Sequence, residues 1–262
     1  MIKIGLVQAS SSIDVWENMK IIEKYTLAAK KNGCHVICFP ECFLTGYFPE
    51  EVLKRGISAE DKVIKKLLNF AVANRIDILA GFMEVDGDYC YITHGAFLAS
   101  GEIQSYQKTH LGEKEALYFT AGNELKVIRL SNGIKIGFQI CVENHFPEIS
   151  KTLSLKGVEI IFAPHAVPAK AGNRREIWNK IIPARSYDNR VYMACLNQCD
   201  EKFGGGCMVT DPKGNIVATH FEKNENMLIV DLDTEELQKY REETTEKAYR
   251  YYPSKARNEL YL

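Results

Sequence analysis

Hydrophobic and polar residues follow two periods that alternate from one end of this chain to the other. Short apolar runs such as IKIGLVQA, HVICFP and DILAGF are typical of buried strands. Between them, apolar residues recur every three to four positions, which is typical of helices that bury one face. We expect helices over residues 15–29, 59–74 and 174–189, and a further one from Pro147 to just before Gly157.

The other apolar runs predict more strands, some of them joined by tight turns. YCYITHGAFLAS and EIQSYQK meet at Ser100-Gly101, and LKVIRL and IKIGFQI are separated by Ser131-Asn132-Gly133. VEIIFAP, VYMACLNQ, GCMVTD, NIVATH and MLIVDL complete the set. Because strands and helices interleave without a linker or repeat, residues 1–262 are predicted to form a single α/β domain. The strands of the two halves are alike, which favours two packed sheets with helices outside.

The final segment, residues 242–262, does not follow this pattern. It is polar and aromatic, rich in Tyr and Arg, and too poor in aliphatic residues to form a core of its own. We expect it to be a tail that packs on the body of the protein or on a partner subunit.

Charge and composition exclude several classes of function. The 33 basic and 34 acidic residues nearly cancel, and no stretch is strongly basic, so we expect no binding to nucleic acid. No apolar run approaches the ~18 residues that span a membrane, and the N-terminus reads as a strand and not as a signal peptide. A cytoplasmic protein that does not bind membranes is therefore expected.

The eight cysteines fit free thiols better than disulfides in a cytosolic chain of this length. Cys34, Cys38 and Cys42 are spaced by four residues, which raises the possibility of a metal site. No fourth ligand is evident, so we favour buried thiols that pack as small hydrophobic side chains, and predict no metal.

Reactive side chains stand at the ends of several predicted strands. HVICFP leads into Glu41, EIQSYQ into Lys108 and IKIGFQI into Cys141. Ligand sites of α/β sheets gather at the carboxyl ends of strands, so a carboxylate, an ammonium group and a thiol are expected in one pocket. A thiol with a pKa of about 8.5 is mostly protonated at neutral pH, and a nearby carboxylate can take its proton during attack on a carbonyl carbon. Lys108 and the backbone N–H of Val142 would stabilise the resulting oxyanion.

The segments FPECFLTGY, YQKTHLGEKEALYFTAG and GFQICVENHFPE together resemble the three catalytic segments of the carbon–nitrogen hydrolase (nitrilase) superfamily. The resemblance continues through WNKIIPARSYDNRVYMACLNQ and GGGCMVTDPKGNIVA into RNELYL. It implies a four-layer α-β-β-α sandwich, association into homodimers or larger homo-oligomers, and chemistry without a metal or organic cofactor.

The resemblance also implies roles for individual residues. Glu41 would be the general base, Lys108 the oxyanion partner and Cys141 the nucleophile. Glu115 matches the family's second glutamate, which positions substrate, although Glu113 lies close enough to take that role.

Further residues are candidates to contact the substrate. Val142 and Glu143 follow the nucleophile, where the family commonly has an aromatic and then an acidic residue. Tyr47 either lines the pocket mouth or closes a turn, and His165 either lines the pocket or makes a structural hydrogen bond. Arg174 and Arg175 would bind a substrate carboxylate, unless they are solvated or join subunits. We expect Trp178 to pack its helix against the core.

These observations predict a hydrolase that cleaves a non-peptide C–N bond of a small amide or N-carbamoyl compound through a thioester on Cys141, with release of ammonia. Nitrile hydrolysis by the same site is the nearest alternative. A metabolite-binding or scaffold protein that retains the fold without catalysis is the alternative from another class.

Overall fold

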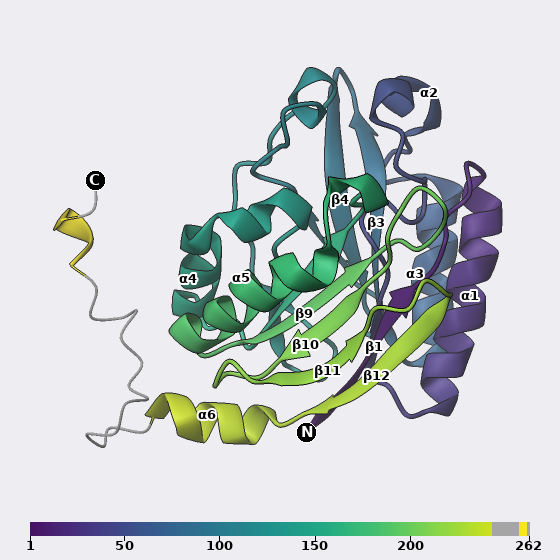
Figure 1. Ribbon diagram of the computed structural model, residues 1–262. Coiled ribbons are helices and arrows are strands. Elements are labelled where there is room, and N and C mark those ends of the chain that lie inside the picture. Colours follow the sequence, from purple (N-terminus) through teal and green to yellow (C-terminus); the bar gives the residue numbers. More distant parts are fainter. Residues whose placement is uncertain (243–256, 261–262) are drawn as a thin grey trace.

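Two six-stranded sheets form the body of the protein in a computed structural model that describes residues 1–242 and 257–260 (Figure 1). In spatial order, the first sheet contains β12 (Asn226–Leu232), β1 (Ile2–Gln8), β2 (Val36–Cys38), β3 (Asp77–Asp86), β4 (Tyr89–Phe97) and β5 (Ile103–Gln107). The second contains β11 (Ile216–His220), β10 (Cys207–Thr210), β9 (Tyr192–Asn197), β8 (Ile160–His165), β7 (Lys135–Phe138) and β6 (Ile128–Arg129).

Each sheet has a parallel centre with antiparallel strands at its edges. In the first sheet β1, β2 and β3 run parallel, and β12 and β4 pair with them in the opposite direction. In the second sheet β7, β8 and β9 run parallel, with β6 and β10 antiparallel beside them. The parallel strands therefore direct their carboxyl ends to one edge of each sheet, which is where α/β folds place ligand sites.

The main core lies between the two sheets. Ile4 and Leu6 of β1 face inward and pack in one cluster with Phe138 of β7 and Phe162 of β8, all of them fully buried. Alternate residues of the same strands face outward, as the two-residue period of a strand requires. Val7, for example, belongs to a separate cluster on the outer face of the first sheet.

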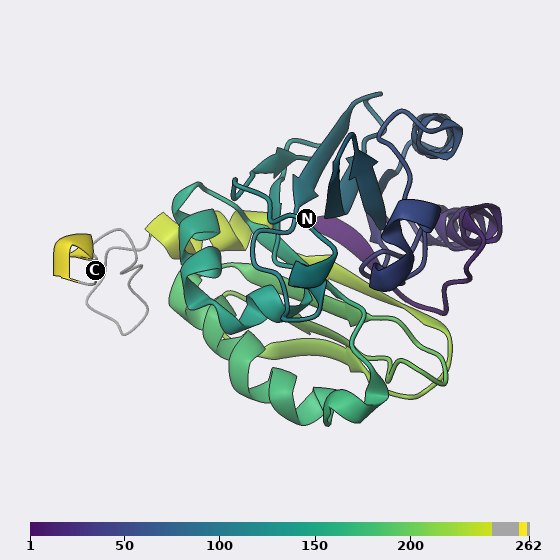
Figure 2. The same cartoon turned by 90° about the horizontal axis from the view of Figure 1, so that it is seen from above.

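Two pairs of helices cover the outer faces. Helices α1 (Val15–Lys31) and α3 (Lys62–Asn74) pack on the first sheet, and α4 (Pro147–Leu155) and α5 (Arg174–Asn189) pack on the second. Figure 2, seen from above, shows the two helix pairs on opposite sides of the sheets. The predicted four-layer α-β-β-α sandwich is confirmed.

Local sequence explains where the helices begin. The Asp14 carboxylate accepts hydrogen bonds from the N–H groups of Trp16 and Glu17 at the start of α1, and Asp61 does the same for Val63 in α3. Helix α3 begins at Lys62, three residues later than predicted, because Asp61 caps it.

The sequence pattern missed the short helical segments. They are α2 (Val52–Arg55), α6 (Thr234–Glu242) and the single 3₁₀ turns η1 (Pro49–Glu51), η2 (Glu115–Leu117), η3 (Cys141–His145), η4 (Ala169–Ala171) and η6 (Asn258–Leu260). Most of the predicted tail, residues 242–262, lies outside the described residues. Within the described ranges, no helix is long and apolar enough to cross a membrane.

Candidate active site

Three strand ends bring a carboxylate, an ammonium group and a thiol together between the sheets. Glu41 follows β2, Lys108 follows β5, and Cys141 follows β7. The Lys108 Nζ lies 2.8 Å from Glu41 Oε1 and 2.8 Å from Glu115 Oε1, and all three side chains are buried. A buried cation held by two carboxylates is a costly arrangement that removal of any one member would unbalance.

Glu41 is held in place from the second sheet. The backbone N–H of Ala166, just after β8, donates to Glu41 Oε2 at 2.9 Å. The Gln198 amide, just after β9, donates to the Glu41 backbone carbonyl at 3.0 Å. Burial raises the pKa of Glu41 to about 7, against the opposing effect of the Lys108 ammonium. A carboxyl group with a pKa near neutral is suited to accept and return a proton.

Lys108 remains charged in this setting. Burial alone would lower its pKa, but Glu41, Cys141 and Glu115 together hold the pKa well above its usual value. The strand end that carries Lys108 is fixed by Gly122, whose N–H donates to the Lys108 carbonyl at 2.9 Å. A Cβ at Gly122 would lie 2.3 Å from the Gln107 carbonyl oxygen, so glycine is required at this contact.

The structure places Glu115, and not Glu113, in the buried cluster, a choice that the sequence left open. Both of its carboxylate oxygens are hydrogen-bonded, since the Tyr47 hydroxyl donates to Oε1 at 2.8 Å and the Gly112 N–H donates to Oε2 at 2.7 Å. Glu113 is exposed. Tyr47, one of the predicted substrate contacts, thus orients Glu115 within the buried cluster.

Cys141 differs from the other seven cysteines, which are all buried, because it is only half-buried. It begins the 3₁₀ turn η3 with a φ of 52°, a left-handed conformation that is uncommon for residues other than glycine. Burial, followed by the Glu41 carboxylate, raises the pKa of the thiol. The resting thiol therefore keeps its proton, and attack on an electrophile requires a base.

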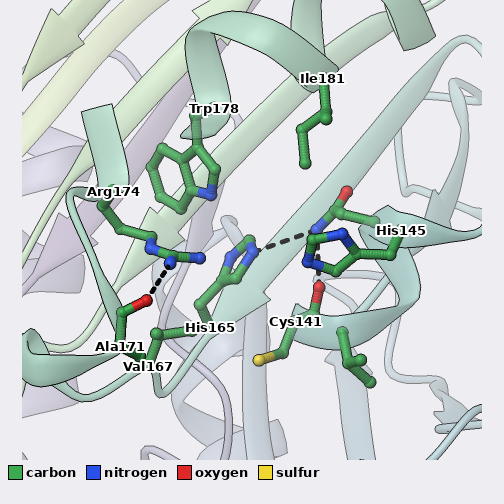
Figure 3. A pocket seen from close by; sticks show the side chains of 10 residues that line it. Cys141, His145, His165, Val167, Ala171, Arg174, Trp178 and Ile181 are labelled. Carbon is green, nitrogen blue, oxygen red and sulfur yellow. Dashed lines mark hydrogen bonds between the residues drawn. The ribbon is translucent and has the colours of Figure 1, made fainter. Parts of the chain in front are cut away.

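Cys141 opens into a cavity of about 250 Å³, shown in Figure 3. Val142 and His165, both predicted to contact substrate, line this cavity. His165 packs against Trp178 with ring centroids 4.8 Å apart and the rings tilted by 50°, and its Nε2 lies 3.1 Å from the Asn144 amide nitrogen. Its Nδ1 lies 2.8 Å from the Ala163 carbonyl oxygen, so Nδ1 carries the proton and Nε2 accepts from Asn144. Burial lowers the pKa of His165 to about 3, and the imidazole is neutral.

Like Tyr47, which does not line the cavity, Glu143 does not match a substrate contact. Its side chain is fully buried, and it is absent from the cavity lining. Its Oε1 accepts hydrogen bonds from the Tyr106 hydroxyl, the Thr109 N–H and hydroxyl, and the His110 N–H, and its Oε2 accepts from the Ile140 N–H. The turn of η3 directs this carboxylate inward, so Glu143 joins the segment before Cys141 to the segment after Lys108.

The two adjacent arginines have different surroundings. Arg174, the first residue of α5, lines the cavity. Arg175 is exposed and lies over the Phe221 ring, 5.7 Å from its centroid. Trp178 is fully buried in the cluster under α5, as expected, and it also forms part of the cavity wall.

Cys34, Cys38 and Cys42 do not form a common site. Cys34 packs on the outer face of the first sheet, whereas Cys38 and Cys42 belong to the core between the sheets. In the part of the chain that the structure describes, no three His, Cys, Asp or Glu side chains are placed to hold a metal ion together.

Sequence reasoning missed the groups that align Glu41 and that complete the cavity wall. The Ala166 N–H carries no sequence signal, because any residue other than proline supplies one. Asn144 and Trp178 had a partial signal, since they stand in the nucleophile segment and on an amphipathic helix.

Comparison with known proteins agrees with this geometry. The carbon–nitrogen hydrolase family model matches residues 3–242. A nitrilase from Pyrococcus abyssi is 29% identical over 89% of this chain and 90% of its own length, and a citrullinase from Francisella tularensis is 26% identical over 92% of each. An N-carbamoylputrescine amidase from Solanum tuberosum is 24% identical over 92% of this chain and 89% of its own length.

Solved structures share the fold. The NitN amidase from Nesterenkonia sp. AN1 superimposes with a TM-score of 0.85 at 24% identity, covering 100% of this chain and 98% of that one. A variant of the same amidase carries acrylamide added to its active-site cysteine, with a TM-score of 0.80, 24% identity, and coverage of 91% and 96%. The family model matches almost the whole of this chain, which therefore belongs to the carbon–nitrogen hydrolase (nitrilase) family.

Proposed function

We propose that this protein hydrolyses a non-peptide C–N bond of a small amide or N-carbamoyl compound through a thioester on Cys141. The observation that carries the proposal is the buried group of Glu41, Lys108 and Glu115, with 2.8 Å contacts on both sides of Lys108, beside the one cysteine that is not buried. The acrylamide adduct of the Nesterenkonia amidase supports a nucleophilic cysteine.

In the first step the Cys141 sulfur attacks the carbonyl carbon while Glu41 accepts the thiol proton. The carbonyl oxygen becomes an oxyanion, which the Lys108 ammonium and the Val142 N–H stabilise. Each such donor contributes about 3 kcal/mol to transition-state stabilisation. The C–N bond then breaks as Glu41 returns the proton to the nitrogen, so that ammonia leaves and a thioester remains.

In the second step water attacks the thioester carbon, and Glu41 accepts a proton from the water. The C–S bond breaks, the acid is released and Cys141 regains its proton. For an N-carbamoyl compound the product is a carbamic acid, which decomposes to carbon dioxide and the amine. Glu115, fixed by Tyr47, orients Lys108 and assists proton movement through it. The scheme uses groups of the protein and water, with no metal or organic cofactor.

A cavity of about 250 Å³ lies just below the ~300–1,000 Å³ typical of ligand sites, so we propose a small substrate. We further propose that the protein is cytoplasmic and forms a homo-oligomer. Size-exclusion chromatography with light scattering tests the oligomeric state.

The test is ammonia release from a panel of small amides, N-carbamoyl compounds and nitriles, with Cys141→Ala and, as a matched control, Cys34→Ala at a buried cysteine remote from the site. We expect turnover by the wild type and Cys34→Ala and none by Cys141→Ala. Intact-mass detection of an acyl adduct on Cys141 identifies the thioester. A panel without turnover, together with equal labelling of all cysteines by a thiol probe, would favour a non-catalytic binding protein. Turnover of nitriles alone would favour the nitrilase reaction.

A further inference from the structure

A single guanidinium lies in the wall of the cavity into which Cys141 opens. Arg174 is half-buried there, and one of its terminal nitrogens donates to the Ala171 carbonyl at 3.2 Å (Figure 3). Its Nε–H is buried and has no partner among the described residues. Burial lowers the pKa of Arg174, and the acidic group that acts against this is the Cys141 thiol. The cation is therefore not neutralised by a protein carboxylate in the cavity wall.

A second unpaired donor lies on the same helix face. Trp178 is fully buried, lines the same cavity, and its indole Nε1–H has no partner among the described residues. Arg174 and Trp178 are four residues apart on α5, so their side chains project from one face. Figure 3 shows the guanidinium beside the indole, on the side of the cavity formed by His165. Buried donors are normally satisfied, so two in one cavity indicate a ligand with acceptor oxygens.

The other residues that line the cavity limit the chemical class of its ligand. Val142, Val167 and Ile181 are apolar, and no aspartate or glutamate lines the cavity. The Asn144 side-chain oxygen, buried and unpaired, is an acceptor for an N–H of the same ligand. A cationic substrate would meet Arg174 without a balancing carboxylate, whereas a carboxylate would take the Arg174 charge and both free N–H groups.

We propose that Arg174, assisted by Trp178, binds a carboxylate of the substrate, so that the enzyme acts on small amides or N-carbamoyl compounds that carry an acid group. This inference rests on the proposed function and names its substrate class. It also separates two neighbouring arginines that the sequence could not distinguish, because Arg175 lies over Phe221 outside the cavity.

The experiment compares matched substrates on matched variants. The substrates are monoamides of short straight-chain dicarboxylic acids, their methyl esters, which lack the charge, and ω-amino amides of equal length, which reverse it. The corresponding N-carbamoyl compounds form a second set. The variants are Arg174→Gln, Arg174→Lys and the control Arg175→Gln, each checked for a wild-type melting temperature.

We expect the wild type to favour the acid over its ester, and Arg174→Gln to lower the ratio of their kcat/KM values by about 10- to 150-fold, the range for a hydrogen bond to a charged group. Arg174→Lys retains the charge without the planar fork and should give an intermediate ratio. Arg175→Gln should keep the wild-type ratio. Preference of the wild type for the ester or the ω-amino amide would overturn the inference, as would an equal loss on acid and ester in Arg174→Gln.

Binding measurements on the inactive Cys141→Ala protein test the carboxylate site independently of the proposed reaction. Titration calorimetry with short dicarboxylic acids should show binding that Arg174→Gln weakens by the same factor and Arg175→Gln does not. The absence of acid binding at millimolar concentration would refute the carboxylate site even if neutral amides are hydrolysed. Conversely, acid binding that depends on Arg174, without turnover of any amide and without an adduct on Cys141, would support the site and reject the proposed hydrolysis.

Discussion

Replacement of Glu143 tests whether one buried carboxylate holds the two catalytic segments in register. Its oxygens accept from the Ile140 N–H at 2.6 Å, the Thr109 N–H and hydroxyl at 2.8 Å each, the Tyr106 hydroxyl at 2.6 Å and the His110 N–H at 3.2 Å. The two hydroxyls already lie 3.1 Å apart and can satisfy each other. The backbone N–H groups of Thr109 and Ile140 have no such alternative.

In Glu143→Ala the buried Ile140 N–H and the half-buried Thr109 N–H lose their acceptor, at about 1–3 kcal/mol each, and the longer His110 hydrogen bond adds less. We therefore expect the free energy of unfolding to fall by about 2–6 kcal/mol, which corresponds to a fall in melting temperature of about 4–24 °C. Glu143→Gln keeps one acceptor oxygen and should lose about 1–3 kcal/mol. Because Ile140 precedes Cys141 and Thr109 follows Lys108, kcat should fall by about 10- to 100-fold with little change in KM.

Urea unfolding followed by circular dichroism measures the stability, and steady-state kinetics on a substrate from the amide panel measures the split between kcat and KM. Glu148→Gln, at an exposed glutamate in the first turn of α4, is the matched control and should resemble the wild type. A Glu143→Ala protein within about 0.5 kcal/mol of the wild type, with unchanged kcat, would refute the reasoning. A rise in KM without loss of kcat would instead indicate that Glu143 contacts the substrate, as expected from the sequence.

Three further predictions concern the buried cluster and its supports. Because burial raises the pKa of Glu41 to about 7 and only its carboxylate form accepts a proton, kcat/KM should fall as the pH drops below about 7 and level off above about 8; a flat profile over this range would contradict the assignment of the base. Gly122→Ala places a Cβ 2.3 Å from the Gln107 carbonyl oxygen and should cost about 1–3 kcal/mol in urea unfolding, with unchanged stability as the contrary result. Tyr47→Phe removes the 2.8 Å hydrogen bond to Glu115 and should lower kcat/KM by about 2- to 12-fold in steady-state assays, whereas wild-type kinetics would show that the hydroxyl is dispensable.

The periodicity of the chain was sufficient to predict most elements, whereas the four layers were implied by the family resemblance. Helix α5 has the predicted bounds, because apolar residues at helical spacing and the Asn173 cap agree. The short segments were missed because η3 and α2 have fewer residues than the two turns needed to show a period. Strand β3 continues to Asp86, well past the predicted run, because β4 pairs with it along its whole length.

The residues of the candidate site were predictable where they stand at the ends of strands. Glu41, Lys108 and Cys141 follow strands that the apolar pattern marks, and the structure brings them together with Glu115. The position of Glu143 was not predictable, since adjacency to a nucleophile does not reveal whether a tight turn directs a side chain outward or inward.

The hydrogen bonds from the second sheet that hold Glu41 in place form late in the synthesis of the chain. The Ala166 and Gln198 groups that fix this carboxylate follow it by 125 and 157 residues, and both emerge after Cys141 during synthesis. A nascent chain therefore carries its nucleophile before the base has been aligned, and base-assisted attack by Cys141 requires the two sheets to dock. Base-assisted turnover at Cys141 thus reports on completion of folding, and its loss should precede the loss of secondary structure when the sheets begin to separate.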